Sequence, residues 1–135
     1  MKPTPSQTVG PFFAVALCRE EMVEGGPVRI QGTVFDGAGE PVPDAYIELW
    51  DGARLGRCPT DEEGRFAFAT VEPEHGHVNV SVFARGLLQR LVTRIYFREP
   101  DDPTLGALLA REAGDGSYRF DIHLQGDRET VFFAL

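Results

Sequence analysis

Residues 28–50 read VRIQGTVFDGAGEPVPDAYIELW, and this stretch decides the fold. Apolar and polar side chains alternate through residues 28–35 and again through 45–50, which is the period of a β-strand. Between these runs, the residues DGAG at 36–39 are typical of a turn, and the two prolines that follow keep the chain extended. The stretch therefore predicts two strands joined by a turn-rich loop.

The same strand pattern recurs along the rest of the chain. A short helix is expected over residues 102–109, because Asp-Pro can begin one and leucines follow at helical spacing. About seven or eight short strands with one small helix predict an all-β sandwich. The further strands are expected over residues 65–70, 78–83, 88–97, 117–124 and 129–134.

The N-terminal residues have a different character. Residues 1–13 read MKPTPSQTVGPFF, and their three prolines disfavour helix. The stretch ends in Phe12 and Phe13, which favour burial. Two interpretations stay open: the arm packs on another subunit, or it crosses its own sandwich. We expect an extended arm over residues 1–14 and one β-sandwich domain over 15–135.

Length and charge exclude several classes of protein. A chain of 135 residues fits one domain. Its net charge of −8 disfavours binding to nucleic acid or to an anionic membrane surface. No apolar run approaches the ~20 residues of a membrane span. Cys18 and Cys58 show no metal-binding spacing, and they favour free thiols in a reducing compartment. We therefore expect a cytoplasmic protein that binds neither nucleic acid nor membranes.

The sequence carries few motifs with a known chemistry. It has no phosphate-binding glycine loop, nucleophile elbow or zinc signature. His77 and Asn79 share one face of an expected strand, but His-x-Asn is a poor metal-binding pair, and a structural or solvated histidine is favoured. Asp121 and His123 also share a face, yet no serine or cysteine nearby completes a catalytic triad.

Arginines are the remaining candidates for ligand binding. Arg85 precedes a glycine after an apolar strand, and its planar guanidinium group suits a carboxylate. A surface ion pair with one of the many acidic residues is an equally good explanation. Arg90, Arg94 and Arg98 share one face of the next expected strand, which favours a solvated or subunit-contact face over a ligand site.

Several segments, taken together and in order, resemble the intradiol ring-cleaving dioxygenases. The most specific are the arm SQTVGP and the stretches FARGL and YRFDI, whereas the turn DGAGEPVPDA is shared with other prealbumin-like sandwiches. The resemblance covers most of the chain and implies a prealbumin-like β-sandwich. The similar segments are residues 4–12, 32–50, 60–66, 77–97 and 118–133.

The resemblance implies where the metal lies. Family members open a catechol ring between its two hydroxyl-bearing carbons, using O₂ and a non-haem Fe(III) held by two tyrosines and two histidines. The chain is most similar to the alpha chains of the protocatechuate-cleaving members, whose iron lies on the beta chain. The family's His-x-His falls on His77 and Asn79, and no tyrosine follows Pro73 as a ligand. The second ligand tyrosine falls in a shortened segment around residues 51–57. The resemblance therefore implies no metal site on this chain and Fe(III) on a partner.

The resemblance also implies a role for the chain. It would be an alpha subunit, without catalytic residues of its own, in a hetero-oligomer whose iron-bearing beta subunit cleaves protocatechuate to 3-carboxy-cis,cis-muconate. Thr8, Gly10 and Pro11 of the arm, together with Arg85, carry over as substrate-binding residues. The chain is shorter than such alpha chains on the active-site side, which implies a more open pocket or a different substrate.

Two other functions are compatible with the same fold. The chain could be a non-catalytic prealbumin-like binding or scaffold module, which would stay a monomer beside an iron-bearing homologue. A transthyretin-like hydrolase is disfavoured, because residues 130–135 lack the Tyr-Arg-Gly-Ser ending of that enzyme.

Overall fold

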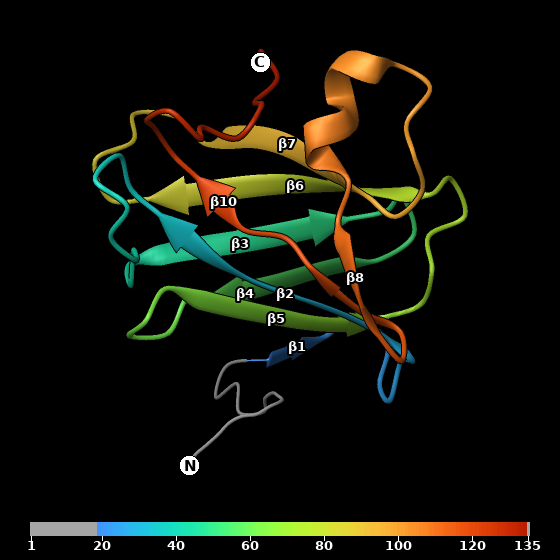
Figure 1. Cartoon of the computed structure of the whole chain (residues 1–135). Helices are drawn as coiled ribbons and strands as arrows, with labels where there is room; N and C mark the ends of the chain where they lie inside the picture. The colour runs from blue at the N-terminus through green and yellow to red at the C-terminus, as the bar shows by residue number, and fades with distance from the viewer. Residues whose placement is uncertain (1–18, 135) are drawn as a thin grey trace.

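Two β-sheets face each other across one core in the computed structural model, which describes residues 19–134 (Figure 1). The predicted all-β sandwich with one small helix is confirmed. The strands are β1 (Arg19–Glu21), β2 (Val28–Phe35), β3 (Ala45–Trp50), β4 (Leu55–Pro59), β5 (Arg65–Thr70), β6 (His77–Ala84), β7 (Leu91–Tyr96), β8 (Arg111–Gly114), β9 (Ser117–Arg119) and β10 (Ile122–His123), and the 3₁₀ helix η1 spans Pro103–Leu108.

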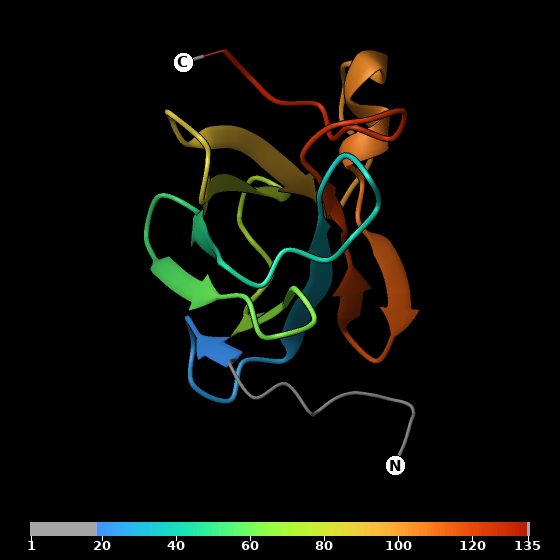
Figure 2. The same ribbon diagram turned by 90° about the vertical axis from the view of Figure 1, so that its left-hand side faces the viewer.

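The two sheets differ in regularity. One has the order β4-β3-β6-β7, and all of its pairs are antiparallel. The other has the order β1-β5-β2-β9-β8, with β10 also paired to β2, and it mixes antiparallel with parallel pairs. Figure 2 views the two layers from the side, with η1 near one end of the sandwich.

The core lies between the sheets and follows the pleat of the strands. Val78, Val80 and Val82 of β6 are at most 1% exposed and pack in one cluster with Ile30 and Phe68 of the other sheet. The residues between these valines are partly exposed, as the alternation of a strand requires. Removal of this apolar surface from water is the main force that holds the layers together.

Two aspartates organise two loops between strands, of which the first is the turn predicted over residues 36–39. The Oδ1 atom of Asp36 accepts hydrogen bonds of 2.9 Å from the backbone N–H groups two and four residues later. Asp61 repeats this pattern with the same distances. Gly39 and Gly64 close the two loops with φ angles of 81° and 74°, which favour glycine. The turn predicted over residues 36–39 is therefore confirmed, and the loop after Asp61 is built in the same way.

The C-terminal third departs from the sequence prediction. Residues 129–134 form no strand, and only one isolated bridge joins Phe133 to Val92. Part of this segment is held instead by a side chain, because the Thr93 hydroxyl donates to the Val131 carbonyl at 2.7 Å. The strand predicted over 88–97 begins only at residue 91, and the helix predicted over 102–109 is a 3₁₀ helix.

The strand predicted over 117–124 is divided into β9 and β10. Asp121 interrupts it, because its Oδ1 atom accepts the Thr33 backbone N–H at 3.0 Å in place of a backbone carbonyl. Pairing with β2 resumes where Ile122 meets Val34. The close crossing requires Gly32, since a Cβ atom there would lie 1.8 Å from the Phe120 carbonyl oxygen.

Two expectations remain to be compared with the structure, one about the N-terminal arm and one about membrane-spanning segments. The arm predicted over residues 1–14 lies outside them, and its border with the domain stays a prediction. Within residues 19–134, no helix is long and apolar enough to cross a membrane.

Candidate functional site

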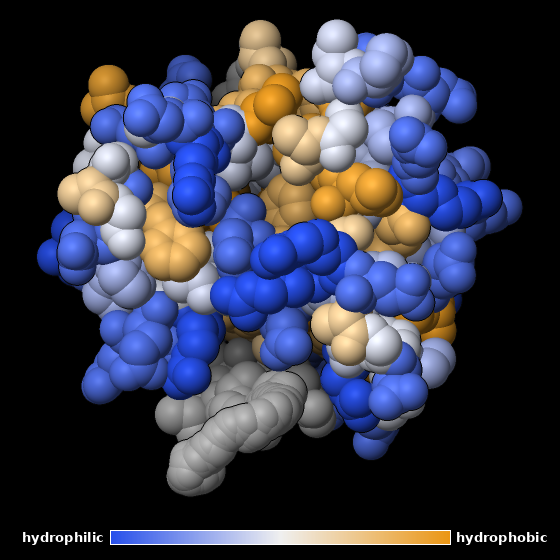
Figure 3. Space-filling view, viewed as in Figure 1, coloured by the Kyte–Doolittle hydropathy of each residue, from blue (hydrophilic) through white to orange (hydrophobic). Residues whose placement is uncertain are grey.

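The side of the regular sheet that faces away from the core carries most of the candidate chemistry. We call this side the outer face. Strand register places Trp50 opposite Asn79, Glu48 opposite Ser81, and Tyr46 opposite Phe83. Figure 3 shows the other side of the molecule, over β2, β8 and β10, where hydrophilic residues surround several hydrophobic patches. The outer face comprises Tyr46, Glu48 and Trp50 of β3, Leu55 and Arg57 of β4, His77, Asn79, Ser81 and Phe83 of β6, and Arg94 of β7.

Arg94 organises one end of the outer face. Its Nε atom donates to Asn79 Oδ1 at 3.2 Å and its Nη1 atom donates to the Tyr96 hydroxyl at 3.1 Å. The ring of Phe133 lies 5.4 Å from the guanidinium carbon, within reach of a cation–π contact. Partial burial lowers the pKa of His77, and the positive charge of Arg94 lowers it further. His77 is therefore neutral at pH 7, beside a fixed cation.

These residues do not fit a ferric ion. In the part of the chain that the structure describes, no group of three or more His, Cys, Asp or Glu side chains could hold a metal ion. Asn79 is already bound by Arg94, whose charge repels a metal cation. Glu48 is paired with Arg57 at 2.9 Å. Iron prefers anionic ligands in an open site, so no iron-dependent step is assigned to these residues.

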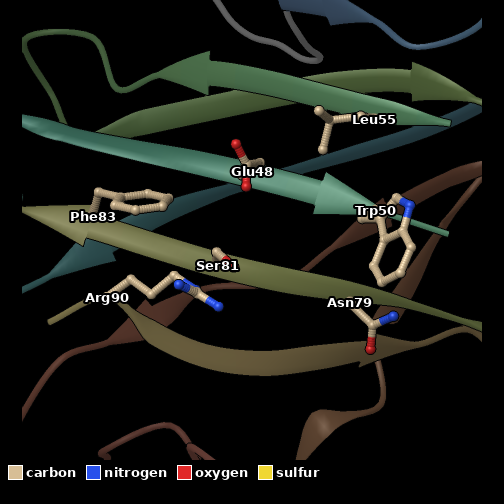
Figure 4. Close-up of a pocket in the computed structure, with 7 residues that line it drawn as sticks. All are labelled: Glu48, Trp50, Leu55, Asn79, Ser81, Phe83 and Arg90. Carbon is tan, nitrogen blue, oxygen red and sulfur yellow. The ribbon is translucent and has the colours of Figure 1, made fainter. Parts of the chain in front are cut away.

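A depression of about 390 Å³ lies in the middle of the outer face (Figure 4). We call it the aromatic cleft. Figure 4 places Trp50 at one end and Phe83 at the other, with Ser81 on β6 between them. The two rings are 52% and 38% exposed, which is unusual for side chains of this size. The lining residues are Glu48, Trp50, Leu55, Asn79, Ser81, Phe83 and Arg90.

Arg85 lies in the loop between β6 and β7, where the sequence predicted it. Its side chain is 84% exposed, and its Nη2 atom lies 3.6 Å from Asp44 Oδ2. Such an exposed pair contributes little to stability. Leu88 of the same loop is fully exposed. The other three predicted substrate-binding residues, Thr8, Gly10 and Pro11, lie outside the described residues.

Asp121 and His123 have structural partners instead of a catalytic arrangement. Asp121 accepts the Thr33 N–H and pairs with Arg119 at 2.9 Å. The ring of His123 stacks on Phe35, with 5.0 Å between the ring centroids. These contacts tie the C-terminal strands to β2.

Sequence reasoning missed both the aromatic cleft and the anchoring role of Arg94. One signal for the cleft was present: in residues 45–50 the polar side of the strand pattern contains Tyr46 and Trp50 beside Glu48. Large aromatic rings on the solvent side of a strand have no role in the core. The role of Arg94 depends on partners from two other segments, so no local pattern predicts it.

Comparisons with known proteins match this fold and sequence. Residues 29–110 match the model of the carboxypeptidase regulatory-like domain. The chain is 34% identical to the protocatechuate 3,4-dioxygenase alpha chain of Burkholderia cepacia, over 100% of this chain and 98% of the relative. It is 30% identical to the alpha chain from Pseudomonas putida, over 96% and 95%.

A solved structure agrees with these relatives. The dioxygenase domain of a dioxygenase–carbohydrate-binding protein fusion from Streptomyces sp. SirexAA-E is 26% identical, over 93% of this chain and 99% of that chain, with a TM-score of 0.64. The Burkholderia alignment runs over 194 positions against 135 residues here, so the relative has segments that this chain lacks. The chain therefore belongs to the family of the protocatechuate 3,4-dioxygenase alpha chains.

Proposed function

We propose that this chain is the iron-free alpha subunit of an intradiol dioxygenase. In this proposal it shapes the substrate pocket of an iron-bearing beta subunit in a cytoplasmic hetero-oligomer. One observation carries the proposal: in a chain similar to alpha chains over its whole length, Arg94 holds Asn79 where the family resemblance expects a metal ligand. Fe(III) on the beta subunit would supply the chemistry that inserts both atoms of O₂ and converts protocatechuate to 3-carboxy-cis,cis-muconate.

Arg85 is the described residue that would bind the substrate. Its guanidinium group is planar, permanently charged and exposed, and it can donate two parallel hydrogen bonds to a carboxylate. The pair with Asp44 is long and exposed, so a substrate carboxylate can replace it at little cost. Thr8, Gly10 and Pro11 of the arm would complete this side of the pocket.

The loop that carries Arg85 also has features of a contact surface. Leu88 is fully exposed, and Arg85 lies three residues away on the same loop. Burial of a leucine against a partner is favoured by roughly 1.5–3 kcal/mol. We therefore place the loop at the border between this chain and the beta subunit, where one side chain contacts protein and the other contacts substrate.

Co-expression with a beta-type chain tests the proposal. We expect an iron-containing hetero-oligomer that cleaves protocatechuate, whereas this chain alone contains no iron. Arg85→Gln should raise the KM for protocatechuate about tenfold, the value of one charged hydrogen bond, with a smaller effect on kcat. Arg111→Gln, an exposed arginine on β8, serves as the matched control and should leave KM unchanged.

The outcomes separate the competing functions. An unchanged KM in the Arg85 variant would remove this residue from the substrate site. A chain that stays an iron-free monomer beside the beta chain would favour the alternative of a prealbumin-like binding or scaffold module. Turnover by this chain alone, with bound iron, would contradict the iron-free role.

A further inference from the structure

We propose that Asp115, in the turn between β8 and β9, is a site of spontaneous isoaspartate formation in the folded chain. The proposal does not depend on the proposed function, because it needs only the turn and its surroundings. Three observations carry it: the dipeptide Asp115-Gly116, a carboxylate that no described residue holds, and the hydrogen bonds that protect the other two Asp-Gly dipeptides of the chain.

The chemistry requires an aspartate followed by a residue whose backbone nitrogen can reach the carboxyl group. The Gly116 nitrogen attacks Cγ of Asp115, a C–N bond forms, and the carboxyl O–H group leaves with the proton of the nitrogen as water. A second water molecule opens the resulting five-membered succinimide ring. Opening at Cγ restores aspartate, whereas opening at the backbone carbonyl carbon of Asp115 yields isoaspartate, in which the main chain runs through the side chain. Glycine favours the attack because it has no side chain to block a close approach.

The turn exposes Asp115 and leaves its carboxylate free. Strand pairing joins Gly114 to Ser117, so only Asp115 and Gly116 form the loop. Their φ angles are 53° and 77°, as in the type I′ turns that Asp-Gly favours. Asp115 is exposed, and it has no hydrogen bond or ion pair with another of residues 19–134. Its carboxyl group is therefore free to rotate toward the Gly116 nitrogen.

The chain also contains two protected copies of the same dipeptide, at residues 36–37 and 51–52. Oδ1 of Asp36 accepts two backbone N–H groups at 2.9 Å. Oδ1 of Asp51 also accepts two, at 2.9 and 2.8 Å, and its side chain is only 5% exposed. Burial alone would raise the pKa of Asp51, but hydrogen bonds from the N–H groups of Ala53 and Arg54 lower it overall, which disfavours the protonated, reactive form. Attack on either carboxyl group requires these hydrogen bonds to break first.

Isoaspartate in the turn would alter one edge of the sandwich. It adds a carbon atom to the main chain of a two-residue loop, and the turn has little room to shift, since a Cβ atom on Gly116 would lie 2.4 Å from the Pro27 carbonyl oxygen. The Gly116 carbonyl also accepts the Arg29 N–H at 2.8 Å, where the pairing of β2 with β9 begins. Figure 1 shows the turn after β8 beside the blue loop that precedes β2. Isomerisation should therefore loosen the pairing of β9 with β2.

Ageing of the purified full chain at neutral pH and physiological temperature tests the proposal. Trypsin releases residues 112–119, EAGDGSYR, which contain Asp115 alone, and residues 30–54, which contain both protected dipeptides. Chromatography and electron-transfer fragmentation distinguish isoaspartate from aspartate at each position. We expect isoaspartate to form at Asp115 at least about tenfold faster than at Asp36 or Asp51, the factor that corresponds to one charged hydrogen bond. The same chain aged in urea is the matched control, in which the three dipeptides should react at similar rates.

A variant and an exchange measurement test the ring mechanism and its structural effect. Asp115→Asn retains the turn, because Asn-Gly also favours type I′, and it should form the same ring faster with loss of ammonia, since its amide is not ionised at neutral pH. In the isoaspartate form, the Arg29 N–H should exchange with solvent about two- to tenfold faster, as expected for one lost backbone hydrogen bond. Circular dichroism confirms that each aged sample is folded.

The outcomes that would overturn the proposal are specific to this turn. No isoaspartate at Asp115 in the folded chain, equal rates at the three dipeptides of the folded chain, or a slower reaction in Asp115→Asn would each contradict it. An unchanged exchange rate at Arg29 would remove the structural effect. None of these results alters the test of the proposed function, which measures iron content and the KM of the assembled enzyme.

Discussion

The two faces of the β4-β3-β6-β7 sheet share one backbone but differ in what their side chains do. On the inner face, Ile47, Leu49 and Val80 are at most 1% exposed and complete the core. On the outer face, Trp50 and Phe83 expose much of their surface beside charged residues. A sandwich of this kind requires the first set for folding and does not require the second. The inner face therefore serves the core, whereas the large rings of the outer face have no role in it.

The largest effect expected from this comparison is on the inner face. Ile47→Ala should lower the free energy of unfolding by about 2–5 kcal/mol, because it removes buried methyl groups and leaves a cavity. Tyr46→Thr, at the adjacent position on the outer face, should change it by less than about 1 kcal/mol. Chemical denaturation of the two variants measures the difference. Similar losses in both would contradict the division of the sheet into a structural and a functional face.

The sequence predicted the regular sheet well, because its information is local. Residues 45–50 form β3 as predicted, and the run at 78–83 is extended by one residue at each end. The alternation of a strand can be recognised from neighbouring residues alone. The turns capped by Asp36 and Asp61 likewise depend only on residues close in the sequence. The strands that escaped prediction are short and lack alternation: β1 consists of charged residues, half of β8 is charged, and β4 contains glycine and proline.

Failures occurred where distant segments decide the structure. The division of β9 from β10 depends on the Asp121 side chain meeting Thr33, nearly ninety residues earlier in the chain. The final segment is held by partners far away in the sequence, because the Thr93 hydroxyl donates to the Val131 carbonyl and the Phe133 N–H donates to the Val92 carbonyl. The same holds for the site: Arg85 could be placed in its loop from sequence, but the cleft requires β3, β4 and β6 in register.

A smaller effect on stability is expected for the ion pair between Arg57 and Glu48 on the outer face. The pair between Arg57 and Glu48 is on the surface, with the arginine side chain 62% exposed. Arg57→Gln should therefore cost only about 0.2–1 kcal/mol of stability. A double-mutant cycle with Glu48→Gln isolates the pair, and a coupling energy as large as the Ile47→Ala effect would contradict the surface assignment.

The smallest expected effect is the change in the free energy of unfolding with pH that His77 causes. Burial and the neighbouring Arg94 determine the sign of this change. Burial and Arg94 hold the pKa of His77 below its ordinary value of 6.5, so the unfolded chain binds this proton more readily than the folded one. Above pH 6.5, the titration of His77 costs the folded state nothing. The free energy of unfolding falls as the pH drops through 6.5, and the contribution of His77 becomes constant below the pKa that His77 has in the folded state. Asp102, whose pKa is lowered by hydrogen bonds from the side chain and N–H of Thr104, titrates below 3.8 and does not contribute in this window.

Unfolding measured across this pH range tests the assignment. His77→Gln should flatten the slope near pH 6.5, since glutamine cannot titrate. Arg94→Gln should also reduce it, because the pKa of His77 returns toward its ordinary value once the neighbouring charge is removed. If the slope persists in both variants, the titrating group lies elsewhere. If both variants reduce it, burial and Arg94 together keep His77 neutral, and the same arginine also repels metal cations from the position beside it.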